Sequence, residues 1–66
     1  MRKYDWSKVP DEINWIATDE SGYKNGYIGK PKCEFYDIWE GNGWIELGYS
    51  EFKGYWKDSL EERPNE

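Results

Sequence analysis

The sequence predicts a mainly β fold: a small antiparallel sheet of about four strands in meander order, with an N-terminal arm and a C-terminal turn or short helix. Short runs rich in β-branched and aromatic residues alternate between apolar and polar positions, and glycine-containing turns separate them. The chain has only 66 residues but carries five tryptophans, six tyrosines and two phenylalanines. Because each buried ring removes roughly 150–250 Å² from water, rings can supply the core that so short a chain needs.

The chain is expected to begin with an extended arm and a first strand. Residues 1–12 are polar and show neither a helical nor a strand period, so we expect an arm that Trp6 and Val9 pin to the domain. Residues 13–18 are rich in β-forming side chains and are expected to be a strand. Alternation along this strand places three apolar side chains on one face: Ile13, Trp15 and Ala17.

A hairpin is expected to return the chain as a second strand. Residues 19–22 indicate a turn, because Gly22 can take the positive φ that a short hairpin demands. Residues 23–30 would then pair with the first strand, and Gly26 and Gly29 indicate a bulge or close packing under a ring.

Two more strands and a helical turn are expected to follow. Residues 34–40 are the clearest strand, and the Gly41-Asn42-Gly43 turn that follows favours a hairpin with the strand at 44–49. Residues 50–62 are expected to be a loop with a short helix over 55–62, followed by a fraying tail at 63–66. The prediction is therefore one domain, 1–66, with its sheet at 13–49. Both faces of the last two strands carry rings, which leaves open which face is outward.

Charge and composition narrow the classes of function. Nine basic and fourteen acidic side chains give a net charge of −5, which disfavours direct binding to nucleic-acid phosphates. No segment approaches the roughly 20 apolar residues that span a bilayer, and the start lacks the apolar stretch of a secretory signal. Cys33 is the only cysteine and is expected to be a packing residue. We therefore expect a cytoplasmic protein without membrane association.

Residue types that carry catalysis are scarce. Histidine is absent, which removes the commonest general base and metal ligand. The neighbouring acids Asp19-Glu20 and Glu61-Glu62 would point to opposite faces of a strand, outside any apolar stretch. A calcium loop starting at Asp19 would place Lys30 where a bidentate carboxylate is required. We therefore expect no enzyme, no catalytic residue, no metal site and no cofactor.

Two known modes of recognition by aromatic side chains fit parts of the sequence. The spacing of prolines and rings resembles the layout of a WW domain, which would imply polyproline binding, but the paired tyrosines are not adjacent and the histidine is absent. That resemblance rests on Pro10, Trp15, Gly22, Tyr23, Tyr27 and Trp39. Exposed rings could also stack on a nucleotide base, although few cations are available beside them to hold its phosphates.

The chain also resembles a group of small, mostly uncharacterised proteins of tailed bacteriophages and prophages. The resemblance lies in W-S-K-V-P at 6–10, N-W-I-A-T-D at 14–19 and the pattern W-x-x-S-L-x-x-R-P at 56–64. It implies a small acidic protein that acts in the host bacterial cytoplasm by binding a host protein. Basic residues interrupt the acids along the chain, so blocking a protein surface fits better than imitation of DNA.

The expected function is non-catalytic binding: inhibition or modulation of a host protein, for example an anti-phage defence protein, by occlusion of its surface. Tryptophan and tyrosine dominate binding hot spots, and acidic neighbours would steer the chain towards a basic partner surface. Rings and acids on the outer sheet face are expected to form the contact: Tyr36, Trp44, Tyr49, Glu34, Glu40 and Glu46. The alternatives are a self-associating virion or assembly component, such as a homodimer, and a nucleotide-sequestering protein.

Overall fold

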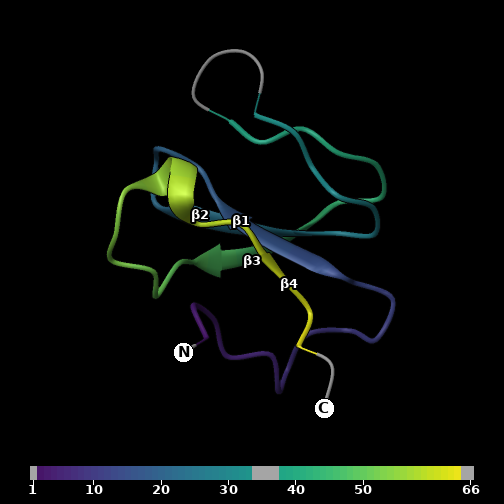
Figure 1. Cartoon of the computed structure of the whole chain (residues 1–66). Helices are drawn as coiled ribbons and strands as arrows, with labels where there is room; N and C mark the ends of the chain where they lie inside the picture. Colours follow the sequence, from purple (N-terminus) through teal and green to yellow (C-terminus); the bar gives the residue numbers. More distant parts are fainter. Residues whose placement is uncertain (1, 34–37, 65–66) are drawn as a thin grey trace.

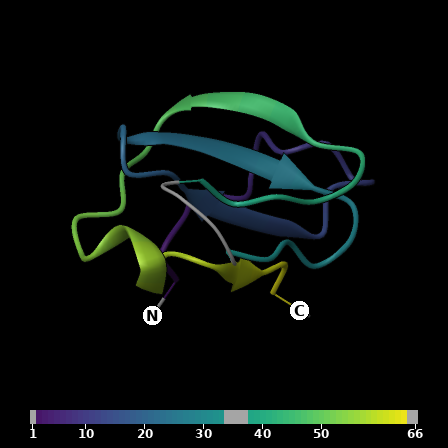
Figure 2. The ribbon, with the colours of Figure 1, turned by 90° about the horizontal axis from the view of Figure 1, so that it is seen from above.

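A computed structural model describes residues 2–33 and 38–64, which form a four-stranded antiparallel sheet. The elements are β1 (Trp15–Thr18), β2 (Tyr23–Tyr27), β3 (Ile45–Tyr49), a 3-10 helix η1 (Trp56–Asp58) and β4 (Glu61–Glu62). Figure 2 shows the strands in the spatial order β3-β2-β1-β4. The predicted mainly β fold with four antiparallel strands is therefore confirmed.

The first hairpin forms as the turn chemistry predicts. Gly22 has a φ of 95° and donates its N–H to the carbonyl oxygen of Asp19 at 2.9 Å, and Asp19 donates to Tyr23 at 2.9 Å. This turn sets the register in which Trp15 pairs with Tyr27 and Thr18 pairs with Lys24. Local sequence is sufficient for this part of the sheet because the turn fixes the pairing of both strands.

A β-bulge shapes the pairing of β2 with β3. The register shifts between Lys24 and Asn25, and Gly48 on the opposite strand has a φ of 93°. Glycine takes this conformation at little steric cost, so it suits the bulged position. Because of the shift, Leu47 packs against the core while Tyr49 pairs with Tyr23.

Three details of the predicted topology are wrong. Residues 38–40 form no strand, and Glu40 makes an isolated bridge to Lys32; residues 34–37 of the predicted strand lie outside the described residues. The strand at 45–49 pairs with β2 instead of with the segment before it. Glu61–Glu62, expected within the helical stretch 55–62, instead pairs with β1 as β4, while the predicted C-terminal turn or short helix is present as η1. The fourth strand thus returns beside the first, as in a Greek key, and not as the end of a meander.

The N-terminal arm covers one face of the sheet, here called the arm face. Figure 1 shows the arm running along this side, below the sheet and close to the C-terminal segment. Its side chains build the core with β1: Tyr4, Trp6, Ile13 and Ile16 are buried, and Val9, Leu47 and Phe52 pack against them. Ile13 therefore packs with Ile16, whereas the sequence grouped it with Trp15 and Ala17.

Glu61 and Arg63 hold the arm in place. Glu61 accepts from the indole Nε1 of Trp6 and from the backbone N–H of Lys3, both at 2.8 Å. Arg63 donates to the carbonyl oxygens of Pro10 and Ile13, at 2.6 and 2.8 Å. These contacts join the two ends of the described chain, so the arm and the β4 region stabilise each other.

The opposite face, here called the loop face, carries Tyr23, Asn25 and Tyr27 of β2, which alternate to the same side of the sheet. The segment 38–44 lies over it, on the side away from the arm (Figure 1). The described segments contain no helix long and apolar enough to cross a membrane.

Candidate functional site

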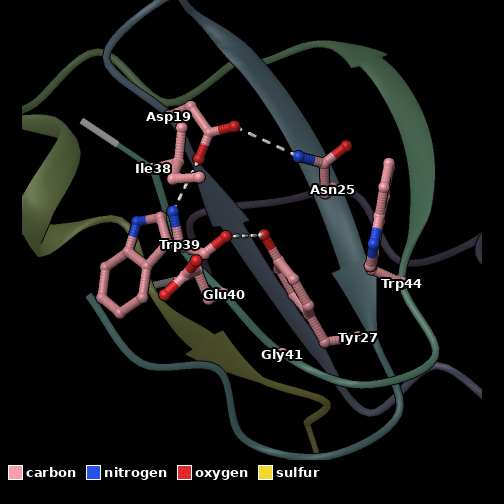
Figure 3. A pocket seen from close by; sticks show the side chains of 8 residues that line it. All are labelled: Asp19, Asn25, Tyr27, Ile38, Trp39, Glu40, Gly41 and Trp44. Atoms are coloured by element: carbon pink, nitrogen blue, oxygen red, sulfur yellow. Dashed lines mark hydrogen bonds between the residues drawn. The ribbon is translucent and has the colours of Figure 1, made fainter. Parts of the chain in front are cut away.

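The loop face holds a pocket of about 310 Å³ between the sheet and the segment that covers it. Two segments far apart in the sequence supply its walls. Figure 3 shows the side chains that line it: Asp19, Asn25, Tyr27, Ile38, Trp39, Glu40, Gly41 and Trp44. Three aromatic rings and two carboxylates thus line one hollow.

Asp19 stands at one end of the pocket, where β1 passes into the hairpin turn. Its Oδ1 accepts from the backbone N–H of Trp39 at 3.0 Å, and its Oδ2 accepts from the side-chain amide of Asn25 at 3.3 Å. Burial raises the pKa of Asp19 above its ordinary value even though both hydrogen bonds act in the opposite direction. A carboxylate offers about four acceptor positions, so Asp19 keeps capacity for a further donor.

Trp39 is fixed on the loop face by three hydrogen bonds. Besides its N–H to Asp19, its indole Nε1 donates to the carbonyl oxygen of Thr18 at 3.1 Å. Its own carbonyl oxygen accepts from the hydroxyl of Tyr27 at 3.2 Å. The indole is therefore held in one orientation, and Figure 3 shows it pointing away from Trp44, while the backbone N–H and carbonyl oxygen of Trp39 face Asp19 and Tyr27.

Tyr27 forms the floor and is 1% exposed. Burial, assisted by the charge of Asp19, raises its pKa to about 12, so its hydroxyl is a neutral donor at ordinary pH. Gly41 passes over this ring so closely that a Cβ there would lie 2.9 Å from Tyr27 Cδ1. The floor is thus rigid and well packed.

Trp44 is the open wall of the pocket. It is 56% exposed, and Figure 3 shows it across Tyr27 from Trp39. Ile38, on the other side of the opening, is 45% exposed. Large apolar side chains at this degree of exposure around a concave site are typical of an interaction surface.

The six residues expected to bind a partner are placed as follows. Trp44 lines the pocket, and Glu46 lies opposite Asn25, so both are on the loop face. Tyr49 is 77% exposed and stacks on Tyr23 with ring centroids 4.6 Å apart, which puts it on the same face beyond Glu46. Glu40 is exposed at the pocket, whereas Tyr36 and Glu34 lie outside the described residues.

Sequence reasoning missed Asp19 and Trp39 as members of this site. It assigned Asp19 to a turn and Trp39 to a strand, and the contact between them joins positions twenty residues apart. The usable signal was the pair of rings around Gly41-Asn42-Gly43, since a glycine-rich turn flanked by Trp39 and Trp44 indicates a loop that presents aromatic side chains.

Most of the cations lie over rings outside the pocket. Among the residues that the structure describes, five cation–ring pairs have separations of 4.9–5.8 Å: Lys3 with Phe52, Lys24 with Tyr4, Lys30 with Trp15, Lys57 with Trp56 and Arg63 with Trp6. The pocket lining, in contrast, contains carboxylates and no lysine or arginine among the residues that the structure describes. The described lining of the pocket is therefore acidic, while Lys30 lies over Trp15 on the loop face and Lys32 is opposite Glu40.

Within residues 2–33 and 38–64, no three His, Cys, Asp or Glu side chains gather as they would around a metal ion. No known protein family, no curated protein and no solved structure matches the chain. Function must therefore be argued from the site itself.

Proposed function

We propose that this chain is a non-catalytic binding protein that occludes the surface of a partner protein through its loop face. The observation that carries this proposal is the exposure of Trp44 and Tyr49 beside a pocket whose other walls are held rigidly. Exposed rings on a rigid support are the side chains that dominate binding free energy at protein interfaces.

The charge around these rings indicates the chemistry of the partner. Asp19, Glu40 and Glu46 lie on the loop face with Trp44 and Tyr49. Negative charge here raises the association rate with a basic surface and disfavours ligands that carry phosphate. The resemblance to phage proteins makes a bacterial host protein the expected partner and inhibition the expected outcome.

Affinity capture with a matched pair of variants tests the proposal. The tagged chain, Trp44→Ala and Tyr55→Ala are each incubated with bacterial lysate, and captured proteins are identified by mass spectrometry. Tyr55 is a suitable control because it is 60% exposed but does not line the pocket. We expect one protein to be captured by the native chain and by Tyr55→Ala and lost with Trp44→Ala.

Two results would contradict the proposal: capture that survives Trp44→Ala, or loss with both variants alike. Thermal unfolding of each variant must remain cooperative and native-like, because Trp44 is assigned to the surface and its removal should leave the fold intact. An unfolded Trp44→Ala variant would instead place this ring in the core and refute the assignment.

Self-association is a second candidate because β3 is an edge strand of the sheet. An edge strand offers backbone groups to another chain, and the loop face beside it would be buried in a homodimer. Sedimentation at several concentrations distinguishes the two. A concentration-independent monomer supports heterologous binding, whereas a stable dimer that Trp44→Ala dissociates supports self-association.

A further inference from the structure

The loop-face pocket has the features of a receptor for an organic cation. Trp39 and Trp44 stand on opposite sides of Tyr27, and the carboxylate of Asp19 is at the end of the same hollow (Figure 3). Cations bind over the faces of tryptophan and tyrosine, and a neighbouring carboxylate adds a hydrogen-bond acceptor of opposite charge.

The chain itself uses the same chemistry repeatedly. Within residues 2–33 and 38–64, five lysine and arginine side chains lie over rings of the same chain. The residues described around the pocket include three rings and two carboxylates but no cation. A ligand that carries a positive charge on an extended apolar stem would complement these rings and carboxylates.

We propose that the pocket takes a cationic side chain of the partner protein, a lysine ammonium or an arginine guanidinium, against the exposed indole of Trp44 and within reach of the Asp19 carboxylate. This inference rests on the proposed function, which it deepens by naming the group that the loop face recognises. Glu40 also lines the pocket, but Lys32 is its cross-strand neighbour, so Asp19 is the carboxylate assigned to the cation.

The volume and hydrogen bonding of the site agree with this occupant. A pocket of about 310 Å³ is at the small end of ligand sites and suits one long side chain better than a nucleotide. Asp19 is already oriented by Trp39 and Asn25, at 3.0 and 3.3 Å, so its remaining acceptor positions are fixed before the cation arrives.

Titration of the full chain with three blocked amino acids tests the inference. The probes are the N-acetyl methylamides of lysine, arginine and norleucine, and norleucine matches the lysine stem without its charge. The readout is the set of indole Nε1–H signals in ¹⁵N NMR spectra, where Trp39 is a fixed reporter through its bond to Thr18. We expect saturable shifts of the Trp39 and Trp44 signals with a cationic probe, with a dissociation constant on the order of millimolar.

Three variants distinguish binding of the cation at the pocket from non-specific attraction by the negative charge of the chain. Asp19→Asn should weaken binding of the cationic probe about two- to fivefold and leave norleucine unchanged, because Asn can still accept from the Trp39 N–H. Glu20→Gln neutralises an exposed carboxylate in the same turn and should have no effect. Trp44→Leu, which leaves Asp19 untouched, should also weaken binding of the cationic probe about two- to fivefold by removing one ring. The comparison of lysine with arginine then decides which cation the pocket prefers.

Three results would overturn the inference: norleucine binding as tightly as lysine and arginine, no saturable shift with either cation, or equal weakening by Asp19→Asn and Glu20→Gln in folded protein. Failure of the proposed function is distinguishable from this. A partner captured through Trp44 while the cationic probes do not bind would leave the function standing and refute the cation pocket. Probe binding with no captured protein would support the pocket and refute surface occlusion.

Discussion

Gly26 is a position in the sheet where one added methyl group should destabilise the fold. It lies in β2 opposite Ile16, and a Cβ built there would be 2.6 Å from Ile13 Cγ2 and 3.2 Å from Leu47 Cδ1. Ile13 is 1% exposed and branches at its Cβ, so its methyl group has little room to move. Overpacking of this kind lowers the free energy of unfolding by about 1–3 kcal/mol. The smaller conformational entropy of the unfolded alanine variant offsets about 0.4–1 kcal/mol of this loss. Gly26→Ala should therefore lower the free energy of unfolding by about 1–2 kcal/mol.

Gly29→Ala is the matched control for this prediction. A Cβ at Gly29 would have no heavy atom within 4 Å, so the same substitution should be neutral or slightly stabilising. In a domain of this size 1 kcal/mol corresponds to about 4–8 °C in Tm, so urea and thermal unfolding by tryptophan fluorescence should separate the two variants clearly. Combining Gly26→Ala with Ile13→Leu, which moves the branch away from Cβ, should recover part of the lost stability. The coupling free energy between the two substitutions should be at least about 0.5 kcal/mol. Equal stability of Gly26→Ala and Gly29→Ala would refute the reasoning.

Three further predictions concern hydrogen bonds and ionisation. Glu61→Ala should cost about 1–3 kcal/mol in urea unfolding because Glu61 accepts from the arm at two points, while Glu62→Ala, its exposed neighbour, should cost less than about 0.5 kcal/mol. Tyr4→Phe should cost about 1–2 kcal/mol in the same assay because the buried hydroxyl bonds to the side chain of Thr18 and the carbonyl oxygen of Ser59, and an unchanged midpoint would contradict this. Because the pKa of Tyr27 is raised to about 12 in the folded chain, the unfolded chain loses this proton first on alkalinisation. Stability should therefore be intact below about pH 10 and fall as the pH rises towards 12, more steeply than in Tyr27→Phe, as measured by urea midpoints at each pH.

Local signals predicted the parts of the fold that local chemistry determines. The turn ending at Gly22 set the β1–β2 register, and the alternation of Tyr23, Asn25 and Tyr27 set one face of β2. The β4 strand was missed because its two residues pair with β1, more than forty positions earlier in the chain. The Glu61 side chain also bonds to the arm, more than fifty positions away. Spacing of Trp56 and Leu60 favoured a helix there, but so short a helix gains little on its own, and the tertiary contacts prevail.

The candidate site was predicted in the same partial way. The chain has more aromatic rings than one small core can bury, and this composition predicted that some rings would be exposed. Trp44 and Tyr49 are two of the exposed rings. The pocket did not follow, because it requires the segment at 38–44 to fold back over β2 through the bond between Trp39 and Asp19. A two-residue period cannot distinguish a strand that continues the sheet from a loop that lies across it.

The distribution of charge explains how a chain with nine cations can present an acidic surface. The Arg63 guanidinium lies 4.9 Å from the Trp6 ring centroid and donates to two carbonyl oxygens, so its charge is used in contacts that stabilise the arm. Lys24 pairs with Glu51 and lies over Tyr4, so its charge is likewise committed on the arm face. The carboxylates of Asp19 and Glu40, in contrast, line the same pocket as Trp44, with Lys32 opposite Glu40 as a neighbouring cation. On the arm face, cations of the chain lie over its own rings. On the loop face, the exposed ring of Trp44 can accept a cation from another molecule in the same way.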